Sequence, residues 1–279
     1  MKRITNELIK KFREYLLSEE KAVATIEKYI HDVLVFMSWM AGAEVTKMTV
    51  LEYKQELTEK YAPASVNAAL SSLNSFFAFN EWYDCKVKAL KIQKQIFANK
   101  DKELTKAEYE RLLMAAKSKQ NKKLYMLMQT ICSTGIRVSE LRYITTDAVR
   151  KGEAIINCKG KMRVVILPKQ LCKMLSSYIK EQRISSGSVF ITKNGKPLDR
   201  SNIWKLMKEL CESAGVAKNK VFPHNLRHLF ARTYYSLEKD VVRLADILGH
   251  SSVNTTRIYT METGEQHRIQ IQRLGLLQC

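Results

Sequence analysis

Residues 221–260 read VFPHNLRHLFARTYYSLEKDVVRLADILGHSSVNTTRIYT. His224 and Arg227 are three residues apart, so on a helix they project from the same face. A second histidine, His250, follows an apolar run that closes with Leu-Gly, which is typical of a helix end. Tyr259 lies near the end of the same stretch. One short region of the chain therefore carries His, Arg, His and Tyr in that order.

These residue types suit phosphoryl transfer without a metal ion. A guanidinium makes forked hydrogen bonds to phosphate oxygens, and a tyrosine hydroxyl serves as a nucleophile. Taken singly, His224 or Tyr259 would be read as a packing residue, so the prediction rests on the whole set. The sequence shows no carboxylate cluster and no Cys/His set at metal-ligand spacing. We therefore expect no metal and no other cofactor.

Two segments upstream add charged side chains to this set. Residues 134–141 read TGIRVSEL, and Gly135 allows a tight turn that delivers Arg137 at a helix start. Residues 153–167 alternate like two strands around the turn CKGKM, which contains Lys159 and Lys161. The chain thus supplies a second arginine and a pair of lysines for the predicted site.

The motifs H-x-L-R-H at 224–228 and L-G-H at 248–250, together with Tyr259 and the segment 134–141, resemble the tyrosine recombinase (phage integrase) family. The resemblance covers nearly the whole chain and is closest to the simple, Xer-like form. It implies six catalytic residues, which are Arg137, Lys161, His224, Arg227, His250 and Tyr259.

The family chemistry gives each of these residues an expected role. Arg137 and Arg227 would bind the non-bridging phosphate oxygens. Tyr259 would attack the phosphorus, with His224 as its proton acceptor. His250 would hydrogen-bond the phosphate or position Tyr259. The product would be a 3′-phosphotyrosine bond and a free 5′-hydroxyl, and no ATP would be needed to reseal the strand.

The resemblance places a catalytic lysine on the hairpin, two residues before an arginine. Lys161 fits this position because Arg163 follows it, and it would protonate the leaving 5′-oxygen. The turn is about one residue shorter than the common G-K-G-x-K-x-R form, and Ile166 stands where proline is usual. Lys159 therefore remains an alternative. His228 belongs to the histidine motif and is expected to support the site rather than to react.

Apolar periodicity predicts a mainly α fold with a small β-sheet (α+β). Helices are expected over 6–19, 25–40, 49–59, 64–82, 109–117, 122–133, 169–182 and 199–214, with strands over 154–157, 163–167 and 189–191. Thr49 is the expected cap of the third helix, with Glu52 at capping-box spacing. The resemblance divides the chain into a helical core-binding domain (1–84), a linker (85–102) and a mixed α/β catalytic domain with a C-terminal exchange segment (103–279).

The net charge of +19 is concentrated in the second half of the chain. Residues 1–99 carry 14 Lys/Arg against 12 Asp/Glu, whereas residues 100–279 carry 33 against 16. This asymmetry favours a nucleic-acid surface on the second half. In the first half, the resemblance identifies four DNA-contacting side chains, namely Thr25, Lys28, Ser65 and Asn67. For Thr25 and Ser65 the alternative is a helix cap.

The sequence also indicates where the protein works and with what partners. It has no apolar run long enough for a membrane span and no apolar signal-peptide core, and its six cysteines are scattered. We therefore expect no membrane association, reduced thiols and a cytoplasmic location in the bacterial cytosol. The resemblance implies double-stranded DNA with paired recombination sites and a homo-tetramer on that DNA. The apolar tail would dock on a neighbouring subunit or on its own domain, through Ile269, Ile271, Leu274, Leu276 and Leu277.

The resulting functional hypothesis is site-specific DNA recombination by integration, excision, inversion or resolution. Two alternatives stay open. A type IB topoisomerase shares the Arg-Lys-Arg-His-Tyr chemistry and would relax DNA without exchanging strands between two sites. A catalytically inactive relative would bind DNA without forming a covalent product. Neither the DNA target nor the direction of the reaction follows from the sequence, because base readout depends on geometry.

Overall fold

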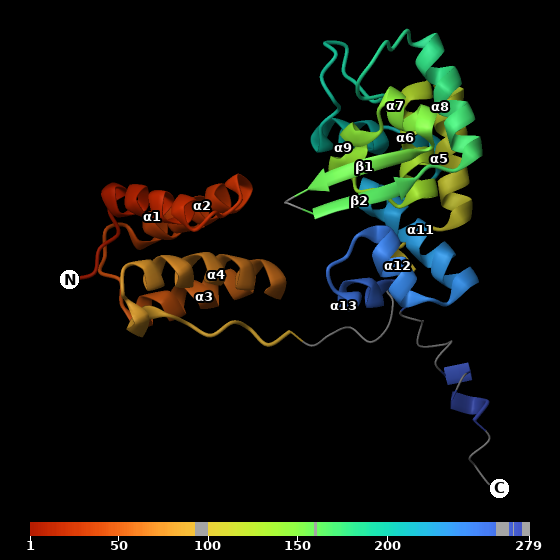
Figure 1. Cartoon of the computed structure of the whole chain (residues 1–279). Helices are drawn as coiled ribbons and strands as arrows, with labels where there is room; N and C mark the ends of the chain where they lie inside the picture. The colour runs from red at the N-terminus through yellow and green to blue at the C-terminus, as the bar shows by residue number, and fades with distance from the viewer. Residues whose placement is uncertain (93–99, 159–160, 261–267, 270, 275–279) are drawn as a thin grey trace, which may run out of the picture. The chain divides into compact units, whose positions relative to one another are not determined.

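The computed structural model describes residues 1–92, 100–158, 161–260, 268–269 and 271–274, and for Lys100, Cys158 and Lys161 only the backbone. The chain forms two compact units, Met1–Lys94 and Gln95–Cys279 (Figure 1). The fold is mostly helical with one two-stranded sheet, as the sequence predicted.

The first unit is a bundle of four helices. They are α1 (Asn6–Ser18), α2 (Val23–Met40), α3 (Lys47–Lys60) and α4 (Pro63–Phe79), followed by the 3₁₀ turn η1 (Tyr83–Cys85). Apolar side chains at helical spacing meet in one core whose centre is aromatic, with Phe12, Phe36, Phe76 and Phe77 fully buried. The four helices predicted from periodicity are all present, with ends shifted by a few residues.

The start of α3 differs from the prediction. Thr46 is the N-cap, and its hydroxyl accepts a hydrogen bond from the Thr49 amide at 3.2 Å. The Thr49 hydroxyl in turn accepts from the Thr46 amide at 2.9 Å. The predicted cap at Thr49 with Glu52 is therefore wrong, because Thr46 already satisfies the first orphan amides and starts the helix one turn earlier.

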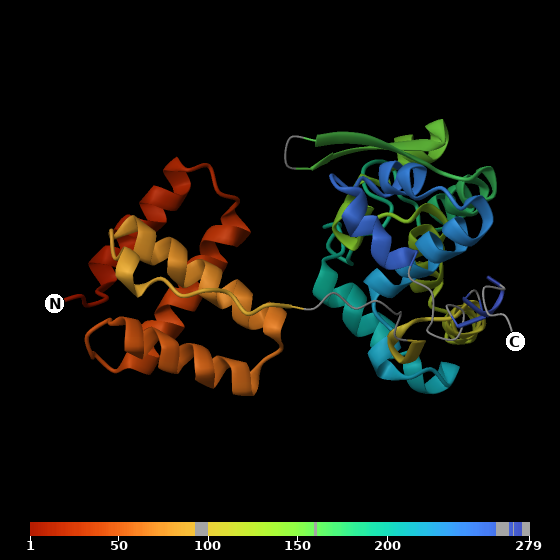
Figure 2. The same ribbon diagram turned by 90° about the horizontal axis from the view of Figure 1, so that it is seen from below.

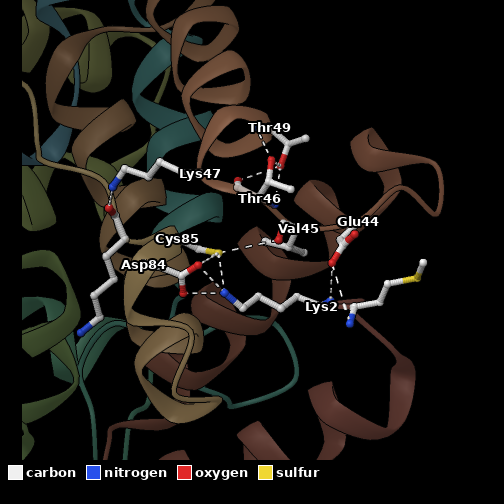
Figure 3. A network of polar contacts seen from close by, with 10 residues as sticks. Lys2, Glu44, Val45, Thr46, Lys47, Thr49, Asp84 and Cys85 are labelled. Atoms are coloured by element: carbon white, nitrogen blue, oxygen red, sulfur yellow. Dashed lines mark hydrogen bonds and ion pairs between the residues drawn. The ribbon is translucent and has the colours of Figure 1, made fainter.

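A polar network joins the N-terminal segment to the loop between α2 and α3 and to the turn η1 (Figure 3). The Val45 amide donates to the Lys2 carbonyl at 2.7 Å, and the Lys2 amide donates to Glu44 at 3.1 Å. The Lys2 ammonium forms an ion pair with Asp84 and lies 3.7 Å from the Cys85 sulfur. Burial raises the pKa of the Cys85 thiol. The segment before α1 and the turn after α4 are thus both held at the loop between α2 and α3.

Two asparagines of α4 hold the chain that follows η1. The Asn74 side chain exchanges hydrogen bonds of 2.8 and 3.0 Å with the backbone of Val87. Asn67 does the same for Leu90, at 2.9 and 2.7 Å. The first part of the segment predicted as a linker therefore lies against α4, while residues 93–99 lie outside the described residues.

The second unit is built around two long central helices, α6 and α11, which pack on each other. Its α-helices are α5 (Lys106–Ser118), α6 (Lys122–Thr134), α7 (Thr146–Lys151), α8 (Lys169–Glu181), α9 (Arg200–Lys208), α10 (Cys211–Ala214), α11 (Pro223–Glu238), α12 (Val241–Leu248) and α13 (Val253–Thr256). Its 3₁₀ turns are η2 (Lys100–Lys102), η3 (Val138–Tyr143), η4 (Lys218–Lys220) and η5 (Arg257–Tyr259). Figure 1 shows α11, α12 and α13 gathered at one end of this unit, where the site forms.

The sheet is the antiparallel hairpin of β1 (Glu153–Cys158) and β2 (Lys161–Ile166), in which Ile156 pairs with Arg163. It runs along the edge of the second unit (Figure 2). The predicted strand at 189–191 is wrong, since in the described part of the chain this segment makes only the isolated bridge of Ile191 with Pro197. That bridge stays a single pair because the chain turns through Gly195 between its two residues. The helix predicted over 199–214 is broken into α9 and α10.

Candidate active site

Three arginines converge on the C-terminal end of α12. Arg163, Arg227 and Arg137 each donate to one of three consecutive carbonyls, those of Ile247, Leu248 and Gly249, at 2.6, 2.7 and 3.1 Å. The last carbonyls of a helix lack intrahelical partners and carry partial negative charge. The helix end therefore holds three guanidiniums side by side.

Glycine is required where α12 ends. Gly249 has φ +64°, in the left-handed region, and a Cβ there would lie 2.7 Å from the Arg163 Nε. Gly135, at the end of α6, has φ +64° as well, and its Cβ would meet the Phe230 ring at 2.5 Å. A side chain at either of these turns, which lead to Arg137 and His250, would thus meet both backbone strain and a steric clash.

One buried carboxylate, Glu140, binds two of the arginines. Its side chain is 3% exposed and accepts from the Arg137 guanidinium at 3.0 Å and from Arg163 at 2.6 Å. It also accepts from the Arg137 amide at 2.9 Å. Burial opposes ionisation, but the hydrogen bond from the Arg137 backbone and the charge of Arg163 together hold the pKa of Glu140 below its usual value. Glu140 enters the sequence analysis only as part of a motif. Its position three residues after Arg137 could have indicated the ion pair between the two side chains.

Arg227 is the most deeply buried cation of the site. It is 1% exposed, and its Nη1 donates to the Gly135 carbonyl at 2.6 Å. Its Nε has no hydrogen-bond partner within the described part of the chain. Burial, and after it the charge of Arg137, lowers the pKa of Arg227 to about 10. The guanidinium is still charged at neutral pH.

His250 lies between Arg227 and Thr256. Its Nε2 is 2.9 Å from an Arg227 Nη, and its Nδ1 is 2.8 Å from the Thr256 hydroxyl. Its ring stacks on that of Tyr259, with centroids 6.1 Å apart. Burial, followed by the charge of Arg227, lowers the pKa of His250 to about 4. The ring is therefore neutral at physiological pH.

A row of three rings leads from the surface to the tyrosine. His224 reaches the surface and meets His228 edge to face at 4.5 Å, and His228 meets Tyr259 in the same way at 5.0 Å. Burial, then the charge of Arg227, lowers the pKa of His224. Burial lowers the pKa of His228 to about 3. Tyr259 is 4% exposed and packs against the rings of His228 and His250 of the same chain.

Five of the six predicted catalytic residues thus lie together, namely Arg137, His224, Arg227, His250 and Tyr259. Lys161 is the first residue of β2, but its side chain is outside what the structure describes. Lys159 lies outside the described residues altogether. Sequence reasoning missed two polar partners, Arg163 and Thr256. Arg163 contacts Glu140 and Ile247, which are distant in the chain. Thr256 contacts His250 from a separate short helix, α13.

Two of the predicted DNA-contacting residues, Thr25 and Ser65, were open to a second reading as helix caps. That reading is wrong, because the N-caps of α2 and α4 are Ala22 and Ala62. Thr25 and Ser65 lie in the first turns of these helices, where Thr25 is half-buried and Ser65 is exposed.

The other two predicted DNA-contacting residues already have partners within the first unit. The exposed Lys28 pairs with Asp32 at 2.5 Å. Asn67 binds the backbone of Leu90 with both ends of its amide, as described above. One Nδ2 hydrogen and one Oδ1 lone pair of Asn67 are left for a contact with DNA.

Neither a metal centre nor a membrane span is found in the part of the chain that the structure describes. No group of three or more His, Cys, Asp or Glu side chains among those residues is placed to hold a metal ion. None of their helices is long and apolar enough to cross a membrane.

Comparison with known proteins identifies the chain's relatives. The profile of the phage integrase family matches residues 102–266, and that of the phage integrase N-terminal SAM-like domain matches residues 9–83. The tyrosine recombinase XerA of Thermococcus kodakarensis is 30% identical over 282 residues, covering 98% of this chain and 97% of the relative.

Two solved structures show the same fold. The XerH site-specific recombinase bound to its difH substrate in a pre-cleavage complex is 20% identical, with a TM-score of 0.71 over 96% of this chain and 85% of that one. A lambda integrase tetramer bound to a Holliday junction is 18% identical, with a TM-score of 0.73 over 91% of this chain and 76% of that one. On the match to the family profile and the full-length relative, the chain belongs to the phage integrase family of tyrosine recombinases.

Proposed function

We propose that the protein is a site-specific DNA recombinase that cuts and rejoins strands through a 3′-phosphotyrosine intermediate. The observation that carries this proposal is the position of Tyr259. It packs on His228 and His250, and His250 in turn contacts Arg227. A hydroxyl nucleophile, neutral imidazoles and phosphate-binding guanidiniums thus lie in one site of one chain, which suits attack on a phosphodiester.

Arg137 and Arg227 bind the two non-bridging oxygens of the scissile phosphate. The Arg137 side chain is 36% exposed, so it is open to an incoming strand. Arg227 keeps its Nε–H unpaired within the described residues. Glu140 and the Gly249 carbonyl hold the Arg137 guanidinium before DNA arrives, and the Leu248 carbonyl holds that of Arg227. Because Arg227 is 1% exposed, its contact with the phosphate requires local opening of the site when DNA binds.

Proton transfer uses residues at the edge of this cluster. A tyrosine hydroxyl has a pKa of ~10, so attack at neutral pH needs an acceptor. Burial and the arginines lower the pKa of His224, and we infer that it accepts the Tyr259 proton even though the His228 ring lies between them in this structure. As the Tyr259 oxygen bonds to phosphorus, the bond from phosphorus to the 5′-oxygen breaks. Lys161 on the hairpin gives that oxygen its proton, with Lys159 as the alternative donor.

The DNA partner follows from charge and from the relatives. Residues 100–279 carry 33 Lys/Arg against 16 Asp/Glu, which favours a polyanion. We infer that residues 103–279 form the catalytic domain, and that residues 1–84, joined through 85–102, contact the duplex through Thr25, Lys28, Ser65 and Asn67. The XerH and lambda integrase structures contain DNA substrates, and the latter is a tetramer. They support a homo-tetramer on two paired sites for this chain.

The tail completes the proposed assembly. Ile269, Ile271 and Leu274 are exposed in the single chain, at 44%, 65% and 62%. Apolar side chains at a chain end are expected to find a partner surface. We propose that residues 261–279 dock on a neighbouring subunit, which would link the four sites. Cooperative filling of a full site in a gel-shift titration is the check on this assembly.

The decisive experiment traps the covalent intermediate. The duplex is taken from DNA that the protein footprints beside its encoding locus, and a nick next to the cleavage position lets the 5′-hydroxyl fragment diffuse away. The wild type should give a band of protein joined to a 3′ end on a denaturing gel, and Tyr259→Phe should give none while its DNA binding stays nearly unchanged. Tyr235→Phe, a half-buried tyrosine of α11, is the matched control and should react normally.

Three outcomes would change the assignment. A covalent band from Tyr259→Phe would remove Tyr259 as the nucleophile. A wild type that binds but never forms the band would be an inactive DNA-binding relative. A band accompanied by relaxation, without exchange between two sites, would place the activity with type IB topoisomerases.

A further inference from the structure

Thr256 is a fully buried polar residue that the proposed chemistry does not use. It is the last residue of α13 and is 0% exposed. Its hydroxyl lies 2.8 Å from Nδ1 of His250. The other ring nitrogen of His250, Nε2, lies 2.9 Å from an Nη of Arg227. Both nitrogens of the histidine are therefore engaged, one by a hydroxyl and one by a guanidinium.

The chemistry of the two partners fixes the proton on the ring. A guanidinium has only N–H donors, so Nε2 of His250 must accept from Arg227 with its lone pair. A neutral imidazole then carries its proton on Nδ1, which donates to the Thr256 hydroxyl. A doubly protonated ring would set an N–H of His250 against the N–H groups of Arg227.

We propose that Thr256 is a positioning residue for strand cleavage: it holds His250 as the Nδ1–H tautomer, so that Nε2 stays directed at Arg227. Its effect on cleavage rests on the proposed function, whereas the tautomer itself does not. In this arrangement His250 orients the guanidinium and presents the face of its ring to Tyr259.

The same hydrogen bond connects the nucleophile's segment to the phosphate-binding cluster. Thr256 is directly followed by η5, whose last residue is Tyr259. The short helix α13 packs on α12, and η5 packs on both α13 and α11. If α13 leaves this place, His250 loses its Nδ1 acceptor and the other tautomer becomes accessible. An N–H would then oppose Arg227. The placement of α13 and η5, which carry Thr256 and Tyr259, is therefore coupled to the orientation of Arg227 through His250.

Three substitutions separate the hydroxyl from the packing. Thr256→Val keeps the branched shape of the side chain but removes the acceptor, and Thr256→Ser keeps the acceptor. Thr255, the exposed neighbour on the same helix, gives the matched control Thr255→Val. All are made in the full chain, with thermal melts to show that each variant folds.

The first readout is the tautomer, observed by NMR on protein labelled with ¹⁵N-histidine. The His250 signals are assigned by their loss in His250→Gln. The wild type and Thr256→Ser should show a protonated Nδ1 and an unprotonated Nε2. Thr256→Val should move a measurable fraction of the proton to Nε2. This experiment needs no DNA and no activity, so it tests Thr256 even if the proposed function fails.

The second readout is the rate of covalent attachment on the nicked duplex. Thr256→Val should be slower by about 10-fold, which corresponds to the loss of one buried hydrogen bond. Thr256→Ser and Thr255→Val should stay within about 3-fold of the wild type, a difference smaller than one hydrogen bond.

Several results would overturn the proposal. They are a wild-type His250 protonated on Nε2, a normal rate for Thr256→Val, or an equal loss for Thr256→Ser and Thr256→Val. If Thr256→Val does not fold, the wild-type tautomer and the serine variant still decide. A wild type with the expected tautomer but no covalent product would count against the proposed function alone.

Discussion

The two units bury different kinds of side chain. In the described residues of the first unit, Ser72 is the one side chain among the buried polar and charged residues, and its hydroxyl donates to Asp32. The second unit buries Arg227 and Glu140, and also Thr130, Thr134, Asn225 and Thr256. Charge follows the same division, with near balance in residues 1–99 and a large excess of Lys/Arg in residues 100–279.

The difference shows which polar groups serve folding and which serve chemistry. In the first unit, Asn74 and Asn67 fasten backbone that would otherwise be unpaired. In the second unit, three guanidiniums lie close together and one carboxylate, Glu140, pairs with two of them, an excess of like charge that folding alone does not favour. Such a cluster with strongly lowered pKa values is the mark of a functional site, here one for an anion.

The largest expected effect tests whether the arginines of the site act through the planar shape of the guanidinium. Arg137→Lys and Arg227→Lys keep a positive charge but lose the planar fork, and each should slow covalent attachment by about 10³-fold. Arg13→Lys, on the exposed face of α1 in the first unit, is the control and should react at the normal rate. Single-turnover cleavage of the nicked duplex gives the rates. A near-normal rate for either site variant would place that arginine outside the reaction and weaken the contrast between the units.

The second prediction concerns acid stability. An unfolded histidine takes up a proton near pH 6.5, whereas folded His228 does so only near pH 3. Between these values the unfolded state binds more protons, so stability falls as the pH drops below 6.5. His228 should account for a loss of about 2 kcal/mol between pH 6.5 and 5.

The measurement compares thermal or urea unfolding across that pH range. His228→Phe keeps a ring between His224 and Tyr259 and should reduce the slope, while His250 and His224, whose pKa values are also lowered, keep the rest of it. His31→Phe, on the exposed face of α2, should leave it unchanged. Equal slopes in the wild type and His228→Phe would mean that the second unit's buried histidine is not what sets its acid sensitivity.

The smallest expected effect compares the units as DNA-binding surfaces. Arg200, exposed at the start of α9, lies near enough to His224 to lower its pKa, so it borders the site. Arg200→Gln should lower DNA affinity a few-fold and reduce the slope of log affinity against log salt by about 1. Lys28→Gln should change both less, because Lys28 already pairs with Asp32. Fluorescence anisotropy over a salt series measures both, and a larger effect from Lys28 would reverse the proposed division of labour.

Much of this arrangement could be predicted from the sequence, because regular apolar spacing identifies most of the helices and five site residues lie in recognisable motifs. The cap of α3 could not, since Thr46 and Thr49 both precede suitable helical residues and only backbone geometry separates them. The partners of the arginines could not either. Some of these partners are the backbone carbonyls of residues 247–249, and a carbonyl is the same whatever the side chain. Another is Glu140, which lies 23 positions before Arg163 in the sequence. The hydrogen bond of Thr256 depends on where α13 packs.

The gathering of three arginines at the end of α12 also bears on how the protein can be engineered. Removing one member of a buried ion cluster is strongly destabilising, whereas replacing the whole set by apolar side chains of similar volume is often neutral or stabilising. A search for heat-resistant variants would therefore reject a single change at Arg163, which takes a partner from Glu140, and would favour joint apolar replacement of Arg137, Glu140 and Arg163. Such a joint variant would be expected to keep the fold and lose the ability to hold a phosphate.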